Sequence, residues 1–224
     1  MGYTMARKKD TDNTLFDPPS GGEWDQKLMP LIEKYQATPH PLQYKNLYQL
    51  MVMVILSAQD SDKHINEVAP PFFAAFPDFA AIAKASPRAL HPYLKGVRNF
   101  VHKCEWLYKT AVKLGNGKIS LKMEDLTALD GIGRKSANVI RREMKENAEG
   151  IIVDLHVLRV MPRLGISQAK DATRMEKDLM QAISKPLWHH VGMCISFLGR
   201  EICRPSNPKC GECLLNPHCA FARS

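Results

Sequence analysis

Long apolar runs are absent from the 224-residue sequence. The longest run, from Leu50 to Leu56, is far shorter than the roughly 20 residues that a membrane-spanning helix needs. No segment near the start of the sequence has the apolar core of a secretory signal peptide. We therefore expect a cytoplasmic protein that has no association with a membrane.

The sequence also lacks repeats of fixed period and the alternating apolar and polar residues that are typical of strands. From Trp24 onward, apolar residues recur at helical spacing instead. The segment from Tyr44 to Ala58 is apolar nearly all round, which indicates a helix buried in the core. We predict an all-α fold, with further helices at residues 64–76, 78–85, 87–94, 99–115, 122–129, 134–147, 153–164, 171–183 and 186–199.

Acidic residues are outnumbered by basic ones. The chain has 31 Lys and Arg against 23 Asp and Glu, which gives a net charge of +8 and a pI near 9.2. This excess favours a polyanionic partner, either nucleic acid or an anionic membrane, and the charge alone does not decide between the two.

Cysteine is scarce outside the last part of the chain. Cys104 and Cys194 stand alone in apolar helical surroundings, which indicates buried thiols. Four thiolates close together can hold a zinc ion or a four-iron four-sulfur cluster. The other four cysteines follow the pattern Cys203-x6-Cys210-x2-Cys213-x5-Cys219, which contains one Cys-x2-Cys pair. Structural zinc sites usually have two such pairs, so this pattern favours the cluster.

The stretch "LDGIGRKSA", residues 129–137, predicts a tight turn between two helices. Gly131 and Gly133 can let backbone amides approach an anion, and the positive end of the following helix would attract it. One interpretation is a helix-hairpin-helix that grips a DNA phosphate, with Arg134 as an added cation. The other is a turn that needs glycine for steric reasons alone.

Two polar side chains at and after this turn are candidate catalytic residues. A lysine in the first turn of a helix, such as Lys135, lies beside the positive helix end, which favours the uncharged amine that a nucleophile requires. An ordinary surface lysine is the alternative. Asp154 stands among apolar residues in "IIVDLHVLRV", either as a catalytic carboxylate or as a helix N-cap. We interpret His156 as a structural histidine.

Several of these segments together resemble the endonuclease III branch of the helix-hairpin-helix DNA glycosylases. The similar segments are "LSAQDSD", "LDGIGRKSANV", "VDLHVLRV" and the four-cysteine spacing, in this order, and the resemblance extends from about residue 26 to residue 219. It implies two helical lobes. Residues 40–147 would form a six-helix barrel that ends in the hairpin, and residues 23–39 and 148–224 would form a lobe with an iron-sulfur loop at 203–219. Residues 1–22 are polar and rich in turn formers, so we expect a flexible leader.

The resemblance implies a monomeric, nucleoid-associated base-excision-repair enzyme that acts on duplex DNA. Lys135 would attack C1′ of a flipped nucleotide, expel a damaged base, in this branch an oxidised pyrimidine, and form a Schiff base that permits strand nicking. Asp154 would stabilise the developing positive sugar, and the four terminal cysteines would hold a [4Fe-4S] cluster. The DNA contacts would come from Gln59, Asn99, Gly131, Gly133, Arg134, Arg204 and Lys209.

The chain departs from the family pattern at four positions. Asn99 stands where the family usually has a leucine that wedges into the opposite strand, and the other departures are Asp130, Leu155 and Leu198. These departures leave the lesion range and the opposite-base preference open. Two other functions also stay open. One is a monofunctional glycosylase for alkylated or mispaired bases, in which Lys135 is incidental. The other is a non-catalytic DNA-binding module with a structural metal.

Overall fold

The computed structural model describes residues 22–115 and 117–223, so the predicted leader falls, apart from Gly22, outside the described residues. Within these ranges the chain is helical and contains no strand, which confirms the all-α prediction. The elements are α1 (Asp25–Tyr35), α2 (Leu47–Leu56), α3 (Asp62–Ala75), α4 (Phe79–Lys84), α5 (Pro87–Leu94), α6 (Phe100–Leu114), α7 (Met123–Thr127), α8 (Arg134–Glu143), α9 (Leu155–Leu164), α10 (Ala172–Ala182), η1 (Lys185–Leu187), α11 (Trp188–Glu201), η2 (Cys210–Glu212), η3 (Asn216–His218) and η4 (Phe221–Arg223).

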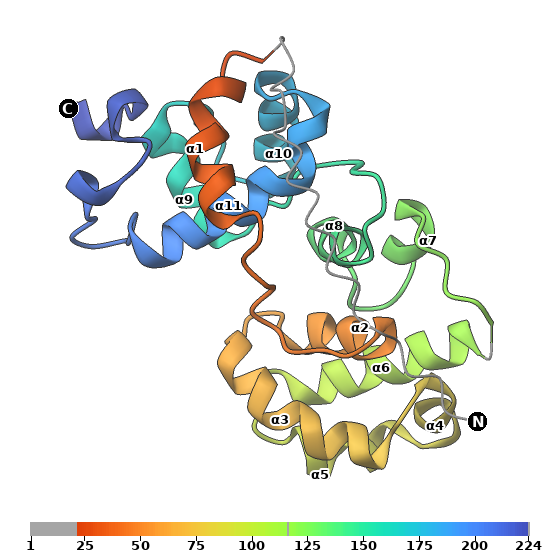
Figure 1. Ribbon diagram of the computed structural model, residues 1–224. Coiled ribbons are helices and arrows are strands. Elements are labelled where there is room, and N and C mark those ends of the chain that lie inside the picture. The colour runs from red at the N-terminus through yellow and green to blue at the C-terminus, as the bar shows by residue number, and fades with distance from the viewer. Residues whose placement is uncertain (1–21, 116, 224) are drawn as a thin grey trace, which may run out of the picture.

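The helices form two groups in space (Figure 1). In one group, α1 packs against α11 and α11 packs against α9, so the first described helix joins the C-terminal part of the chain. In the other group, α4 and α5 pack on α6, and α2 packs between α6 and α8. The C-terminal turns η2 to η4 lie beside the first group.

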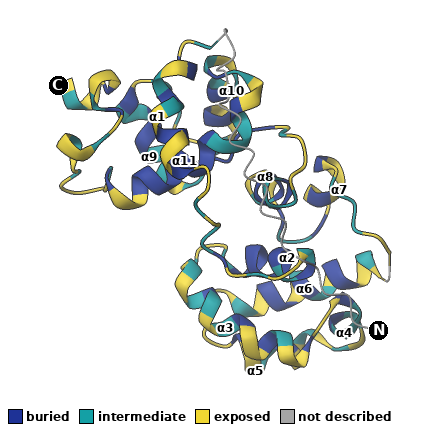
Figure 2. Ribbon diagram, viewed as in Figure 1, coloured by how far each residue is buried: buried dark blue, intermediate teal, exposed yellow. Residues whose placement is uncertain are grey.

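Helix α2 is the most deeply buried element. The side chain of Asn46 caps it by accepting a hydrogen bond of 2.9 Å from the amide of Gln49. Every residue from 50 to 56 is at most 4 % exposed, as the dark blue helix in Figure 2 shows. This confirms the prediction of a core helix between Tyr44 and Ala58, although the helix proper is shorter at both ends.

Helix α8 ends earlier than the sequence predicts. The periodicity indicated a helix over 134–147, but α8 ends at Glu143. Lys145 adopts a left-handed backbone with φ of 60°, and the amide of Glu146 donates to the carbonyl of Arg141 at 2.9 Å. Such a left-handed residue followed by a backward hydrogen bond terminates a helix.

Candidate active site at the hairpin and the start of α9

The two hairpin glycines serve different purposes. Gly131 has φ of 78°, and a Cβ atom there would lie 3.0 Å from Trp106 and 3.1 Å from Ile55, so it needs glycine for steric reasons. Gly133 has an extended backbone, is exposed, and would have no atom within 4 Å of an added Cβ. The space beside Gly133, at the start of α8, is therefore open to solvent. The first amides of a helix have no partner within it and suit an anion.

The two cations that follow Gly133 also differ. Arg134 pairs with the nearly buried carboxylate of Glu176 on α10 at 2.6 Å and donates to the carbonyl of Glu149 at 3.2 Å. Asn138 donates to the same Glu176 carboxylate at 3.0 Å. Arg134 thus joins α8 to α10, a role that the sequence did not suggest. Lys135 is exposed, and within the described residues its ammonium group forms no ion pair or hydrogen bond.

Asp154 is the N-cap of α9, which confirms one of its two interpretations. Oδ1 accepts hydrogen bonds of 2.9 Å from the amides of His156 and Val157. Oδ2 accepts a hydrogen bond of 2.5 Å from the hydroxyl of Ser196 on α11. The cap occupies only one carboxylate oxygen, and the residue is half-buried rather than enclosed. Capping therefore leaves the carboxylate able to act on a neighbouring positive charge.

Ser196 is a site residue that sequence reasoning missed. It is fully buried, and it is the residue of α11 that bonds the Asp154 carboxylate. The available signal was a single hydroxyl inside the apolar run from Val191 to Leu198. A buried hydroxyl needs a partner, so such a residue points to a polar group on a neighbouring helix.

We expect Ser196→Ala to slow base excision roughly 10- to 150-fold, because a hydrogen bond to a charged group contributes about 1.5–3 kcal/mol. Single-turnover excision rates measure this effect. Ser167→Ala is the matched control, since Ser167 forms a similar hydrogen bond of 2.6 Å to Asp178 on α10. Equal excision rates in the Ser196 variant and the wild type would mean that the hydroxyl does not orient the carboxylate.

The charges of Lys135 and Asp154 each act on a nearby histidine ring. Burial lowers the pKa of His40, and the charges of Asp62 and Lys135 also act on that ring. Burial lowers the pKa of His156 as well, and the charges of Asp154 and Asp62 act on it. The charge of Asp62 therefore acts on both rings, together with Lys135 on that of His40 and together with Asp154 on that of His156.

His156 behaves as the sequence predicted. Its Nδ1 lies 3.2 Å from a guanidinium nitrogen of Arg159, a group that can only donate. Nδ1 must then be the acceptor, so the ring is neutral. The same Arg159 group donates to the carbonyl of Gly199 at 2.8 Å, which joins α9 to α11. These contacts support a structural role for His156.

Four of the predicted DNA contacts lie on the surface. Gln59, Asn99, Arg204 and Lys209 are all exposed. Lys209 pairs with Glu212 at 3.3 Å, an exposed ion pair that contributes little to stability. Asn99 precedes α6 without capping it through its side chain. The four side chains are therefore accessible to a large partner.

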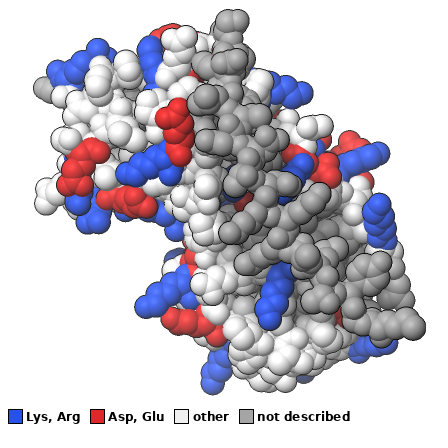
Figure 3. All heavy atoms as spheres, viewed as in Figure 1, with Lys and Arg blue, Asp and Glu red and all other residues white. Residues whose placement is uncertain are grey.

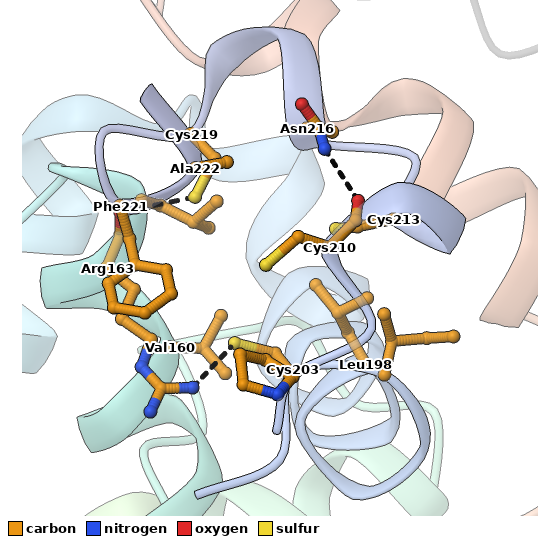
Figure 4. Close-up of a pocket in the computed structure, with 13 residues that line it drawn as sticks. Val160, Arg163, Leu198, Cys203, Cys210, Cys213, Asn216, Cys219, Phe221 and Ala222 are labelled. Atoms are coloured by element: carbon orange, nitrogen blue, oxygen red, sulfur yellow. Dashed lines mark hydrogen bonds between the residues drawn. The ribbon is translucent and has the colours of Figure 1, made fainter. Parts of the chain in front are cut away.

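The four C-terminal cysteines line one pocket (Figure 4). All four are free thiols. The pocket wall is otherwise mostly apolar, and Arg163 on α9 donates to Cys203 Sγ at 3.3 Å. In the described part of the chain, no three Cys, His, Asp or Glu side chains converge closely enough to hold one metal ion. Four thiolates that line one pocket can hold a four-iron four-sulfur cluster or a zinc ion.

The two remaining cysteines are buried thiols, as predicted. Burial raises the pKa of Cys104 and of Cys194 to about 12. A thiol with so high a pKa is a poor nucleophile at neutral pH. They are therefore part of the core rather than of the chemistry.

The family model for the HhH-GPD superfamily base excision DNA repair proteins matches residues 52–185. Endonuclease III of Synechocystis sp. is 34 % identical over 200 residues, which cover 88 % of this chain and 91 % of the relative. The chain belongs to the endonuclease III family. Endonuclease III of Haemophilus influenzae is 31 % identical, over 83 % of this chain and 90 % of the relative.

Solved structures agree with this family assignment. A trapped endonuclease III–DNA covalent intermediate matches with a TM-score of 0.80 and 27 % identity, over 88 % of this chain and 94 % of that one. A thermostable thymine-DNA glycosylase, at 16 % identity and a TM-score of 0.74, shares the fold. Like its family, the chain is a base-excision-repair DNA glycosylase and abasic-site lyase that acts on damaged bases. This excludes the alternative of a non-catalytic DNA-binding module.

Proposed function

We propose that this member of the endonuclease III family removes oxidised pyrimidines from duplex DNA through a Schiff base on Lys135. The observation that carries the proposal is the contrast at the start of α8. Arg134 forms an ion pair with Glu176, whereas the Lys135 amine is exposed and unpaired within the described residues. Lys135 lies two residues after Gly133, where the exposed start of α8 can receive a DNA phosphate.

The proposed chemistry starts from a nucleotide flipped out of the stack, because the reacting bond is unreachable inside the duplex. The Lys135 amine, after losing a proton, forms a bond to C1′ while the glycosidic bond breaks. The base leaves with that electron pair and takes up a proton. The sugar ring then opens to a Schiff base, β-elimination nicks the strand, and hydrolysis regenerates the amine. Asp154 stabilises the positive charge that develops on the sugar.

DNA would bind with one phosphate at the hairpin and with Gln59 and Asn99 in the duplex. Arg204 and Lys209 would track the backbone from the cysteine loop. Basic side chains on the face in Figure 3 are spread over both groups of helices, with acidic ones among them.

The two lobes, with boundaries at 40–147 and at 23–39 plus 148–224, remain part of the proposal, as do the monomeric state and the cytoplasmic, nucleoid-associated location. No helix in the described ranges is long and apolar enough to cross a membrane.

Members of the family are generally known to bind a [4Fe-4S] cluster. We propose that Cys203, Cys210, Cys213 and Cys219 hold it here. When bound, the cluster joins four thiolates and can exchange an electron. Arg159 and Arg163 hold the start of the cysteine loop through Cys203 and reach it from α9, the helix that Asp154 caps.

The purified protein should contain about four irons and four inorganic sulfides per chain and absorb broadly in the visible range. Metal and sulfide analysis checks this. Cys210→Ser should lose iron together with the visible absorbance, whereas Cys104→Ser, a control at a buried thiol outside the pocket, should keep both. A colourless wild type with one zinc per chain would overturn the cluster assignment.

Borohydride trapping on a panel of duplexes tests the substrate class. Each duplex carries one oxidised pyrimidine, alkylated base, mispair or abasic site. We expect trapping with oxidised pyrimidines and with abasic sites. Base release from alkylated or mispaired duplexes without trapping would instead support a monofunctional enzyme that activates water.

A further inference from the structure

Two exposed residues next to helices that pack on each other have a left-handed backbone. Gln59, beyond the end of α2, has φ of 58°, and Asn99, before α6, has φ of 55°. The other described non-glycine residues in this region are Lys145 and Asn207. Asparagine adopts this conformation readily, whereas glutamine seldom does and needs surroundings that hold it. Neither side chain forms a hydrogen bond within the part of the chain that the structure describes. Both are therefore presented to solvent by a constrained backbone.

The carboxylate of Asp60 links the two segments. Its Oδ2 accepts a hydrogen bond of 2.9 Å from the amide of Arg98, and its Oδ1 accepts from the amide of Ser61 at 2.8 Å and lies 2.9 Å from His64 Nδ1. The Asp60 side chain is only 11 % exposed. Asp60 directly follows Gln59, and Arg98 directly precedes Asn99. One carboxylate thus connects the immediate neighbours of both exposed residues.

Three hydrogen bonds favour the ionised form of the Asp60 carboxylate. Burial alone would raise the pKa of Asp60, but the hydrogen bonds from Arg98, His64 and Ser61 outweigh it and hold that pKa below its usual value. Asp60 is therefore ionised at neutral pH. Hydrogen bonds to an ionised acceptor are roughly twice as strong as neutral ones, so the hydrogen bond from the Arg98 amide to Asp60 is a strong one.

A second hydrogen bond, in the core, also joins the end of α2 to α6. Lys103, in the second turn of α6, is 1 % exposed and donates from Nζ to the carbonyl of Leu56 at 2.7 Å. Leu56 ends α2, three residues before Gln59, and Lys103 lies four residues after Asn99. The end of α2 and the start of α6 are thus joined both at the surface and in the core.

We propose that Asp60 is a positioning residue that fixes the spacing between Gln59 and Asn99, so that both enter the duplex together when a nucleotide is flipped. This rests on the proposed function. Flipping leaves a gap in one strand and an unpaired base in the other. Two side chains whose backbone positions are fixed in advance fill both places with a smaller loss of conformational entropy than two side chains on mobile loops. Asp60 would then raise the population of the flipped state without changing the rate of bond cleavage within it.

Three variants test this proposal. Asp60→Ala removes the connection. Asp60→Asn keeps an oxygen that can accept from the Arg98 amide. Asp78→Ala is the control, because Asp78 also bonds a backbone amide in this group of helices, that of Ala81 at 2.7 Å, but at the start of α4. The readouts are single-turnover excision of an oxidised pyrimidine, borohydride trapping on a preformed abasic site, and the fluorescence of 2-aminopurine placed opposite a stable abasic analogue.

We expect Asp60→Ala to slow excision roughly tenfold, as the loss of a charge-assisted hydrogen bond predicts, while trapping on the abasic site changes by less than about threefold. The 2-aminopurine signal should fall with the excision rate. Asp60→Asn should restore both to within about threefold of wild type, and Asp78→Ala should leave both unchanged.

The proposal would be overturned if Asp60→Ala had the excision rate and the fluorescence of the wild type. It would also be overturned if this variant lost activity equally on the oxidised pyrimidine and on the abasic site. Failure of Asp60→Asn to restore the signal would do the same. If the proposed function itself is wrong, the wild type will not trap on any duplex, which separates the two failures.

Discussion

Lys135→Gln should abolish borohydride trapping and strand nicking, by on the order of 10³-fold or more, as expected when a covalent nucleophile is removed. Glutamine keeps most of the volume of lysine at an exposed position that has no side-chain partner in the described chain. The hairpin, with Gly131 and Gly133, is unchanged. Duplex binding should therefore persist, as measured by fluorescence anisotropy at fixed salt.

Lys145→Gln is the control for this variant, because it removes the same charge from an exposed lysine just past the opposite end of α8. It should trap at the wild-type rate. If Lys135→Gln still trapped, another amine would be the nucleophile. If both variants lost binding equally, the role of Lys135 would be purely electrostatic.

Asp154→Asn should reduce base excision on the order of 10²-fold or more, since electrostatic and proton-transfer roles each contribute at least that much. The fold should survive, because asparagine can still cap α9 through its Oδ1, and its amide can donate to the Ser196 hydroxyl. Single-turnover excision and the melting temperature, measured on the same preparation, check both expectations.

Asp154→Ala separates the two roles of this residue. It removes the cap as well as the charge, so it should also lower the free energy of unfolding by about 1 kcal/mol. Asp171→Asn, at the N-cap of α10, controls for the change of one capping carboxylate into an amide. An Asp154→Asn variant with normal excision would leave the residue with capping alone.

Local patterns in the sequence were sufficient to predict the helices and the order of the motifs. The apolar segment around α2, the glycines before α8 and the carboxylate before α9 each show their role within a few residues. The end of α8 was predicted wrongly, because the pattern of apolar residues continues past Glu143 while the backbone of Lys145 turns left-handed. Periodicity reports which side chains are buried but does not report a change of φ.

The contacts that orient the site could not be predicted, because they join residues far apart in the chain. Ser196 bonds Asp154 from 42 residues away, and Glu176 pairs with Arg134 from the same separation. Asp60 accepts from the Arg98 amide across 38 residues. None of these pairs shares a helix face or a turn. Their partners become visible only when the helices are packed together.

The most direct test of the account is to map the residue that carries the DNA adduct. The wild-type enzyme is trapped with borohydride on a duplex with one oxidised pyrimidine, the complex is digested with nuclease and protease, and the peptides are sequenced by mass spectrometry. Lys135 should carry the reduced sugar remnant, in the peptide that follows the hairpin glycines. An adduct on any other residue, or release of the base without an adduct, would contradict the account.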